Sequence, residues 1–441
     1  MRLLIILLFL LLGSAQSLTE VLVGQPDRPQ GAVVLVIDGM GSSYVYPEYG
    51  TQARALDGGV LGKAALFSLA GGARVLDVRV PVPGAGHNVL VTGCPWADEP
   101  LEGTTVFDLA REKNVTCVAL LQKGSLPLAL EQDAFLLFGE GVAVALDAEP
   151  VVGTRAGLSP DLVSRLQGWR DQFPAYAAGC GIDGCIGSNT WGLDAAVDLV
   201  RTLDPPFVLL VDLGGVEDAG RLLGPEAYLE AIASLDEPLA RLVQACEGQD
   251  LLLLVTADGG MTFSDRGQID PGRMESLRVP AVFMGPGVDD LLLTGAWSQA
   301  DIAPTVVEML GLDDGSLSRS EGAVMPVRKR YDLEVRGIDP ADVVRVRRDG
   351  GLVAEVAGDS GYIFRGMDRG AYTVGVGRRS VPVCLNGDGL LDLATTGRTP
   401  GVVVAWPALP HVERRTLLGA ILILMINLAG VAMIVRIVRG G

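Results

Sequence analysis

The chain has 441 residues, of which 49% are hydrophobic, and its formal net charge is −18. This length allows one large domain with a smaller one, or two to three domains. Because so acidic a chain offers no positive field to neutralise phosphates, the charge excludes nucleic acid as a partner.

Residues 1–17 have the pattern of a secretory signal peptide. Arg2 precedes an unbroken apolar run from Leu3 to Leu12, and small residues follow that suit cleavage after Ala15 or Ser17. The run is too short to span a membrane comfortably, so we expect export and cleavage. An uncleaved N-terminal anchor is the alternative.

The next region, from residue 20 to 325, is predicted to be an α/β domain. Apolar strands alternate with amphipathic helices there, which is typical of a mainly parallel sheet sandwiched by helices. Strands are predicted at Val33–Ile37, Val89–Val91, Val115–Leu121, Ala134–Leu137, Phe207–Asp212, Leu251–Thr256 and Val279–Met284. Helices are predicted at Thr105–Lys113, Ser159–Gln172, Trp191–Leu203, Pro225–Ala245 and Ser298–Leu310. Cys180 and Cys185 flank a short glycine-rich loop and are candidates for a local disulfide.

Carboxylates follow or end three of these predicted strands. Asp38 follows Val33–Ile37, Asp212 ends the strand at 207–212 just before Glu217, and Asp258 follows Leu251–Thr256. If the strands are parallel, these groups meet at one edge of the sheet, where ligands of open α/β sheets bind. Gathered carboxylates repel one another unless a cation neutralises them, so this edge is a candidate metal or phosphate site. Alternatively, each acid caps a helix or turn separately.

The pattern of apolar and polar residues changes in the segment 327–396. Apolar and polar residues alternate at Tyr331–Val335, Val343–Val346, Leu352–Val356, Tyr362–Arg365 and Tyr372–Val376, with glycine-rich turns between them. Period-two runs of this kind predict a small C-terminal antiparallel β-sandwich. We expect a stalk or docking module there, because the segment has no histidine and no compact carboxylate cluster.

The chain ends with a predicted membrane anchor. After a juxtamembrane segment at 397–415, residues 416–435 form an uncharged apolar run long enough to cross a bilayer, and 436–441 are left as a cytoplasmic tail. Together with the signal peptide, this one C-terminal transmembrane helix predicts a single-pass protein of the cell membrane whose main domain lies outside the cytoplasm.

The α/β domain resembles the alkaline phosphatase superfamily, which includes sulfatases, type I phosphodiesterases and cofactor-independent phosphoglycerate mutases. The segments that carry the resemblance occur in the superfamily's order: Val33–Gly41, Gly86–Gly93, Glu217–Pro225, Val255–Met261, Val279–Val288 and Trp297–Thr305. The resemblance covers about residues 32 to 312. It implies phosphate- or sulfate-ester chemistry, in many members with two metal ions.

The resemblance further implies an attacking Ser or Thr, a first-strand aspartate, an Asp-x-x-x-His pair, an Asp-His pair and a third histidine. Asp38 matches the first-strand aspartate, and Asp258 keeps the acid of the Asp-His pair. The nucleophile position, four residues before His87, is Pro83, which has no nucleophilic side chain.

All three histidine positions of the resemblance are altered. The Asp-x-x-x-His pair falls on Glu217 and Arg221, Gly259 follows Asp258, and Gln268 is the nearest polar residue to the third position. Arg221 cannot bind a metal, but it could neutralise Asp38, Glu217 and Asp258 as an ion-pair network. His87 is interpreted as a hydrogen-bonded structural residue.

Two hypotheses about function follow. The first is a catalytically degenerate ectodomain that acts as a surface binding or structural protein, with the membrane and a protein or surface polymer as partners. The alternative is an active metal-dependent phosphoester or sulfate-ester hydrolase with one divalent ion on Asp38, Glu217 and Asp258, or with Asp212 in place of Glu217. The cofactor is accordingly one Mg²⁺, Ca²⁺ or Zn²⁺ ion, or none.

The hydrolase alternative needs an unorthodox nucleophile. Ser42, Ser43 and Thr92 are the candidates for this nucleophile. Each also has a commoner interpretation as a turn, cap or helix-start residue.

Overall fold

The structure is a computed structural model of the chain. It describes residues 18–24, 27–46, 48, 53–64, 72–81, 86–95, 104–122, 134–138, 151–153, 159–179, 181–312, 317–394 and 403–404. The predicted signal peptide, the predicted membrane anchor at 416–435 and Cys180 lie outside these residues. No helix within the described ranges is long and apolar enough to cross a membrane.

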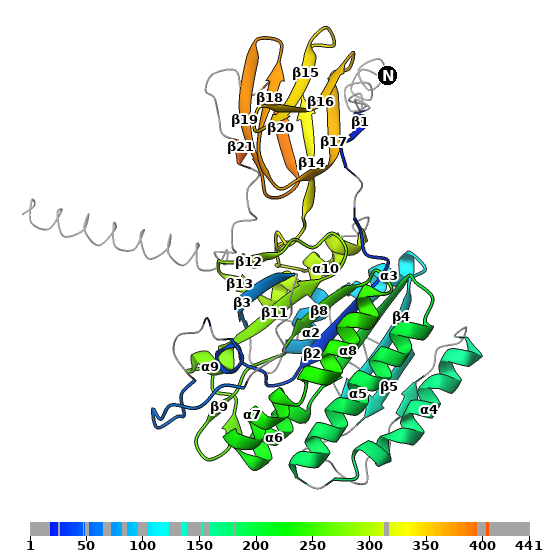
Figure 1. Cartoon of the computed structure of the whole chain (residues 1–441), viewed down its shortest axis with the longest axis vertical. Coiled ribbons are helices and arrows are strands. Elements are labelled where there is room, and N and C mark those ends of the chain that lie inside the picture. Colours follow the sequence, from blue (N-terminus) through cyan, green and yellow to red (C-terminus); the bar gives the residue numbers. More distant parts are fainter. Residues whose placement is uncertain are drawn as a thin grey trace, which may run out of the picture.

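A ten-stranded sheet forms the centre of the α/β domain (Figure 1). Its order is β12-β3-β11-β8-β2-β7-β4-β5-β6, with β13 beside β3. The strands are β2 (Ala32–Ile37), β3 (Ala73–Arg79), β4 (Thr116–Gln122), β5 (Ala134–Phe138), β6 (Val151–Gly153), β7 (Phe207–Leu213), β8 (Leu252–Thr256), β11 (Arg278–Met284), β12 (Leu291–Leu293) and β13 (Trp297–Ser298). The central strands β8, β2, β7, β4 and β5 run parallel, whereas β11 is antiparallel to both of its neighbours.

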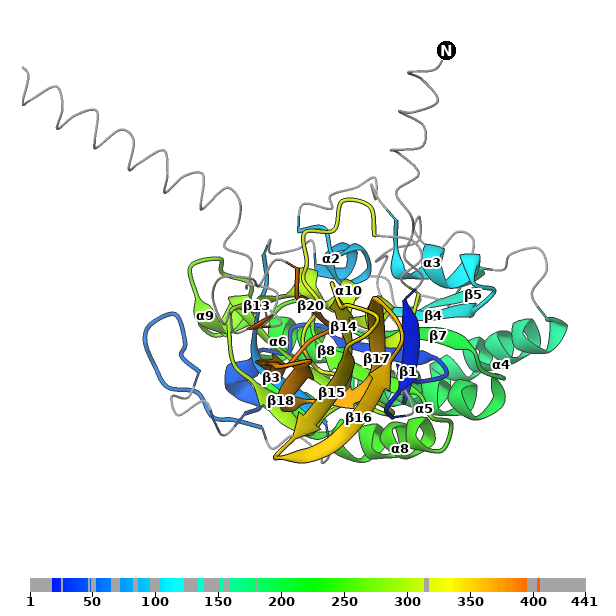
Figure 2. The same ribbon diagram turned by 90° about the horizontal axis from the view of Figure 1, so that it is seen from above.

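Helices cover both faces of this sheet, as the sequence predicts (Figure 2). On one face lie α2 (Gly86–Thr92), α3 (Val106–Glu112) and α10 (Ile302–Leu310). On the other lie α5 (Ile182–Thr202) and α8 (Asp236–Glu247), with α4 (Pro160–Tyr176) packed on α5. The remaining elements of the domain are η1 (Ser42–Tyr44), α6 (Gly215–Leu223), α7 (Pro225–Ala233), β9 (Thr262–Phe263), β10 (Gly267–Gln268), α9 (Met274–Leu277) and η2 (Gln299–Asp301).

Most of the predicted elements of this domain are present, with two corrections. The predicted strand Val89–Val91 is wrong, because these residues lie in helix α2. A three-residue apolar run cannot distinguish a strand from a buried helix segment, which explains the error. The single helix predicted over Pro225–Ala245 is two helices, α7 and α8, that meet at Ser234 and Leu235.

The segments after residue 327 form a β-sandwich with its own apolar core. One sheet has the order β1-β17-β14-β20 and the other β16-β15-β18-β19-β21. The strands are β1 (Thr19–Leu22), β14 (Arg330–Arg336), β15 (Val343–Arg348), β16 (Gly351–Ala357), β17 (Gly361–Asp368), β18 (Gly370–Val376), β19 (Arg379–Leu385), β20 (Gly389–Asp392) and β21 (Val403–Val404). The sandwich is not purely antiparallel, since β1, β20 and β21 each pair in parallel with their neighbours.

Strand β1 corrects the predicted domain boundary at residue 20. It pairs with β17, so the N-terminal strand completes the C-terminal module. A four-residue strand whose partner lies some 340 residues away leaves no local pattern for sequence analysis to detect. Val21 packs against the core of the sandwich, whereas Leu22 is 61% exposed.

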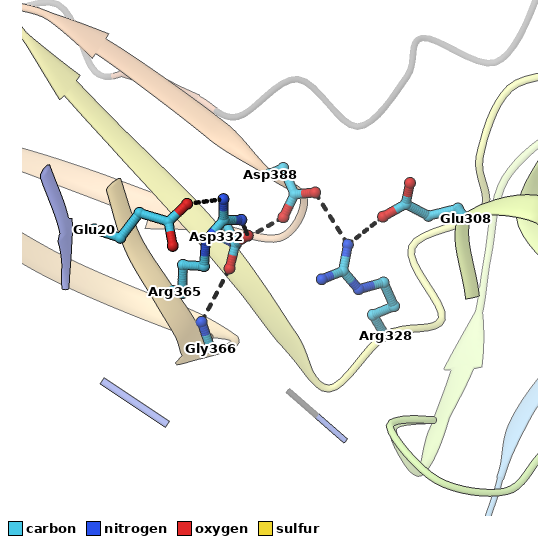
Figure 3. A network of polar contacts seen from close by, with 7 residues as sticks. All are labelled: Glu20, Glu308, Arg328, Asp332, Arg365, Gly366 and Asp388. Carbon is cyan, nitrogen blue, oxygen red and sulfur yellow. Dashed lines mark hydrogen bonds and ion pairs between the residues drawn. The ribbon is translucent and has the colours of Figure 1, made fainter. Parts of the chain in front are cut away.

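Ion pairs join the sandwich to the α/β domain (Figure 3). Arg328 pairs with Glu308 of α10 and, at 3.0 Å, with Asp388 of the sandwich. Arg365 holds β1 to β14, because its guanidinium lies 2.6 Å from both Glu20 and Asp332. A cavity of about 290 Å³ lies at this junction. Arg328 thus links α10 to the sandwich, whereas the two pairs of Arg365 lie within the sandwich.

Candidate functional site

The central strands bring the predicted carboxylates to one edge of the sheet. Strand β2 pairs in parallel with both β7 and β8, with Val36 opposite Asp212 and Thr256. Asp38 therefore lies two residues beyond this level, as does Asp258, and the Asp38 amide donates to the carbonyl of Leu213 at 2.9 Å. The expectation that these acids share one edge is confirmed.

His87 lies between two of these acids. It stands in the first turn of α2, and its Nε2 is 3.2 Å from Oδ1 of Asp38 and 3.2 Å from Oδ1 of Asp212. Both carboxylates are buried, and the imidazole is 16% exposed. Asp212, which sequence analysis gave only as the alternative to Glu217, is thus part of the cluster, and His87 is its central member.

The cluster favours a protonated imidazole. Burial alone would lower the pKa of His87, but the carboxylates of Asp212 and Asp38 outweigh burial and raise that pKa well above its ordinary value. Burial raises the pKa of Asp38 to about 7, with Asp212 adding to the shift and His87 opposing it. Burial likewise raises the pKa of Asp258 to about 6, and Asp38 adds to that shift. A positive His87 is therefore the nearest compensation for two buried negative charges.

Glu217 and Arg221 form a separate pair beside the cluster. Both lie on α6, and Nη2 of Arg221 is 2.5 Å from Oε1 of Glu217. Among the described residues this is the only ion pair of Arg221, whose side chain is 37% exposed. The expected neutralisation by Arg221 is therefore found at Glu217 and not at Asp38 or Asp258. The basic side chain next to Asp38 is His87 instead.

The structure places the other substituted positions as follows. A Cβ added at Gly259 would meet no atom within 4 Å, so the space for a side chain beside Asp258 is open. Gln268 is exposed at the end of the β9–β10 hairpin. Pro83 lies outside the described residues.

The alternative hydroxyls are buried. Thr92 caps the end of α2, since its Oγ1 donates to the carbonyl of Asn88 at 2.6 Å and accepts from the amide of Cys94 at 3.1 Å. Ser42 and Ser43 lie in η1, and their hydroxyls are buried without a hydrogen-bond partner among the residues that the structure describes. The structural role of Thr92 is confirmed, whereas no role of the two serines follows from their contacts.

Three buried polar side chains, which sequence analysis missed, brace the loops that follow the strands. The hydroxyl of Tyr228 donates to the carbonyl of Gly39 at 2.7 Å and accepts from the amide of Gly41 at 3.2 Å. Nε2 of Gln299 donates to the carbonyls of Ala257 and Asp258. Only Gln299 had a sequence signal, because it lies in the matched segment 297–305.

Asn189 is the third of these braces. Its Oδ1 accepts from the amide of Gly215 at 3.0 Å, at the start of α6 and just beyond Asp212. Each of the three carboxylate-bearing loops is thus held by one buried side chain from another element. These hydrogen bonds position the loops at the edge of the sheet.

Comparisons with known proteins agree with this architecture. The crystal structure of the wild-type alkaline phosphatase PafA superposes with a TM-score of 0.50 and 14% identity, covering 69% of this chain and 100% of PafA. The α/β domain has the alkaline phosphatase fold. The resemblance to the alkaline phosphatase superfamily is thereby confirmed at the level of the fold.

Two further comparisons give weaker similarity. A protein of the alkaline phosphatase superfamily from Vibrio parahaemolyticus superposes with a TM-score of 0.43 and 14% identity, covering 82% of this chain and 80% of that one. A 2,3-bisphosphoglycerate-independent phosphoglycerate mutase of Haloquadratum walsbyi is 32% identical over 124 residues, which are 27% of this chain and 24% of that protein. The chain thus spans about a quarter of the length of this curated relative. No protein-family model matches the chain.

In this alkaline phosphatase fold, the cluster is compatible with one divalent ion. One donor atom each from Asp38, His87 and Asp212 lie within 4.8 Å of one another. Ligands about 2.1 Å from a tetrahedral metal lie roughly 3.4 Å apart, close to the two distances around Nε2. A bound metal would act as a Lewis acid there. The 3.2 Å distances also fit an imidazolium ion-paired with two carboxylates, although none of these three atoms makes a hydrogen bond among the described residues.

Proposed function

We propose that this chain is a catalytically degenerate protein of the alkaline phosphatase fold, in which the His87 imidazolium occupies the place of a cation. The observation that carries the proposal is the position of His87 Nε2, 3.2 Å from both Asp38 and Asp212. An internal cation at that point offsets one of the two buried negative charges without a metal. The fold is then retained without hydrolysis of phosphate or sulfate esters.

The substitutions around the cluster support the same proposal. A two-metal site needs further ligands beyond Asp38 and Asp258, and the resemblance assigns them to Arg221, Gly259 and Gln268. The first is a permanent cation paired with Glu217, the second has no side chain, and the third is exposed. With Pro83 at the nucleophile position, no side chain is assigned to attack an ester.

We further propose that the protein acts at a membrane surface as a binding or structural protein. The support is the predicted signal peptide and anchor, together with the position of the sandwich. Both β1, which begins directly after the predicted signal peptide, and β21 lie in the sandwich (Figure 1). A chain anchored at its C-terminus would then hold the sandwich next to the membrane and present the α/β domain to the outside, for a protein or surface polymer.

The second candidate is a hydrolase with one divalent ion bound by Asp38, His87 and Asp212. The proximity of the three donor atoms favours it. It requires a neutral His87 and a nucleophile other than residue 83. It keeps the superfamily's phosphate- or sulfate-ester chemistry.

A turnover assay separates the two functions. The purified full chain, in detergent and supplied with Mg²⁺, Mn²⁺ or Zn²⁺, would be tested on an aryl phosphate, an aryl phosphodiester and an aryl sulfate. The proposal predicts no turnover above that of an Asp38→Ala variant prepared in the same way. Metal-dependent turnover that disappears in Asp38→Ala would establish the hydrolase instead.

A further inference from the structure

A second cavity lies on the same edge of the sheet as the carboxylate cluster. Its volume is about 190 Å³, and its lining includes Arg79, Arg278, Trp297, Ser298 and Glu321. Strand β3, which ends at Arg79, runs parallel to β8 and is separated from it by β11. At roughly 4.8 Å per strand, the cavity is therefore about 10 Å along the edge from the strand that carries Asp258.

Two arginines stand side by side in this cavity. Arg79 of β3 is directly opposite Arg278 of the antiparallel strand β11. Residues opposite each other in such a pair project from the same face of the sheet, and like charges there are destabilising. In a chain with 53 acidic and 35 basic residues, such an arrangement is not explained by a shortage of carboxylates.

The two charges are not equally compensated. Nη1 of Arg278 is 2.6 Å from Oδ1 of Asp77. Arg79 is exposed and makes no ion pair or hydrogen bond through its side chain within the described part of the chain. The repulsion is therefore relieved on one side only, and Arg79 keeps all five of its donors.

Further donors adjoin the arginines. Ser298 is the register partner of Arg79 on β13, and its Oγ accepts from the amide of Ala300, so its hydrogen is left to donate. Trp297, which is 5% exposed, has a buried Nε1 without an acceptor in the described part of the chain. Unpaired donors next to an uncompensated guanidinium favour an anionic ligand.

The acidic residues that line the cavity, Asp301 and Glu321, do not compensate the charge of Arg79. Both carboxylate oxygens of Asp301 accept from backbone amides, those of Ser298 at 2.8 Å and Ala323 at 2.7 Å. Glu321 is exposed and makes no ion pair among the described residues. Its charge opposes an anion, but it does not neutralise Arg79.

We propose that Arg79, Arg278 and Ser298 form a binding site for a tetrahedral oxyanion, a phosphate or sulfate group. Guanidinium groups match the oxygens of such groups in charge and geometry. The site is separate from the carboxylate cluster, so it stands whether or not the cluster binds a metal. It goes beyond the proposed surface role by assigning the chemical class of a ligand.

Calorimetric titration of the detergent-solubilised full chain with inorganic phosphate and with inorganic sulfate tests the site, at an ionic strength held constant with chloride. We expect at least one of the two anions to bind the wild type, and Arg79→Gln to bind it about tenfold more weakly. Arg345→Gln is the matched control, because it removes the same charge from an exposed arginine of the sandwich that pairs with Glu355. It should bind like the wild type.

The proposal is overturned if neither anion binds, or if Arg79→Gln binds as tightly as the wild type. It is also overturned if Arg345→Gln weakens binding as much as Arg79→Gln does, which would indicate a general charge effect. Stability without the anion gives an independent measurement. Arg79→Gln should then be at least as stable as the wild type, because it removes a repulsion, whereas a loss of stability would show that Arg79 has a structural partner and would contradict the premise.

Discussion

At the scale of single residues, the two glycines after Asp258 differ in the space around them. A Cβ at Gly259 meets nothing within 4 Å, whereas one at Gly260 would lie 2.0 Å from the carbonyl oxygen of Glu275. We expect Gly259→His to change the free energy of unfolding by less than about 1 kcal/mol, and Gly260→His to cost several times more. Urea unfolding of both variants measures the difference. If Gly259→His lost as much stability as Gly260→His, the space around residue 259 would not be open.

The raised pKa of Asp258 predicts a dependence of stability on pH. A carboxyl with a pKa of about 6 in the folded state and about 3.9 when unfolded binds more protons when folded, so its contribution to stability falls as the pH rises from 4 to 6. We expect Asp258→Asn, unfolded in urea with a chelator, to match the wild type near pH 4. Above pH 7 it should be more stable by about 1–2 kcal/mol, a value reduced for screening by solvent.

The control for this variant is Asp349→Asn, at a carboxylate that is 94% exposed. Its stability relative to the wild type should not change between the two pH values. If Asp258→Asn is less stable than the wild type above pH 7, the ionised carboxylate is stabilised by a partner, and burial does not dominate.

At the scale of elements, the loop after β2 depends on one hydroxyl from α7. Tyr228→Phe would leave the buried amide of Gly41 without an acceptor and the carbonyl of Gly39 without this donor. We expect a loss of about 1–3 kcal/mol in the free energy of unfolding. Tyr46→Phe is the control, because Tyr46 is only 9% exposed and its hydroxyl makes no hydrogen bond within the described ranges. Equal losses of stability in the two variants would show that the hydrogen bonds of Tyr228 to Gly39 and Gly41 do not stabilise the fold.

Sequence analysis could predict the elements whose pattern is local. The buried run Val33–Ile37 and the carboxylate after it fixed the position of the first central strand, and parallel pairing then placed Asp38 and Asp258 on one edge. The helix at His87 could not be predicted in this way, because the run Val89–Val91 suits either element. Its consequence, an imidazole between Asp38 and Asp212, depends on tertiary packing that no local spacing encodes.

At the scale of the whole molecule, the two ends of the described chain meet in the sandwich. Val21 of β1 packs on the sandwich core, and the neighbouring Leu22 is 61% exposed. Val21→Asp should therefore destabilise the sandwich by about 2–3 kcal/mol, because it places a charge against an apolar core, whereas Leu22→Asp should change stability by less than about 0.5 kcal/mol. Limited proteolysis of residues 330–392 would report the difference. If the two variants behave alike, β1 does not complete the sandwich.

In the proposed function, His87 replaces a cation rather than binding one. The most direct measurement is the thermal unfolding of the wild type and of His87→Ala, each with a chelator and with excess Mn²⁺ or Zn²⁺. A ligand that binds only the folded state raises the unfolding midpoint. We predict no metal-dependent shift for the wild type and a rise for His87→Ala, in which Asp38 and Asp212 are left without their counter-ion. A rise for the wild type that disappears in His87→Ala would contradict the claim and identify His87 as a metal ligand.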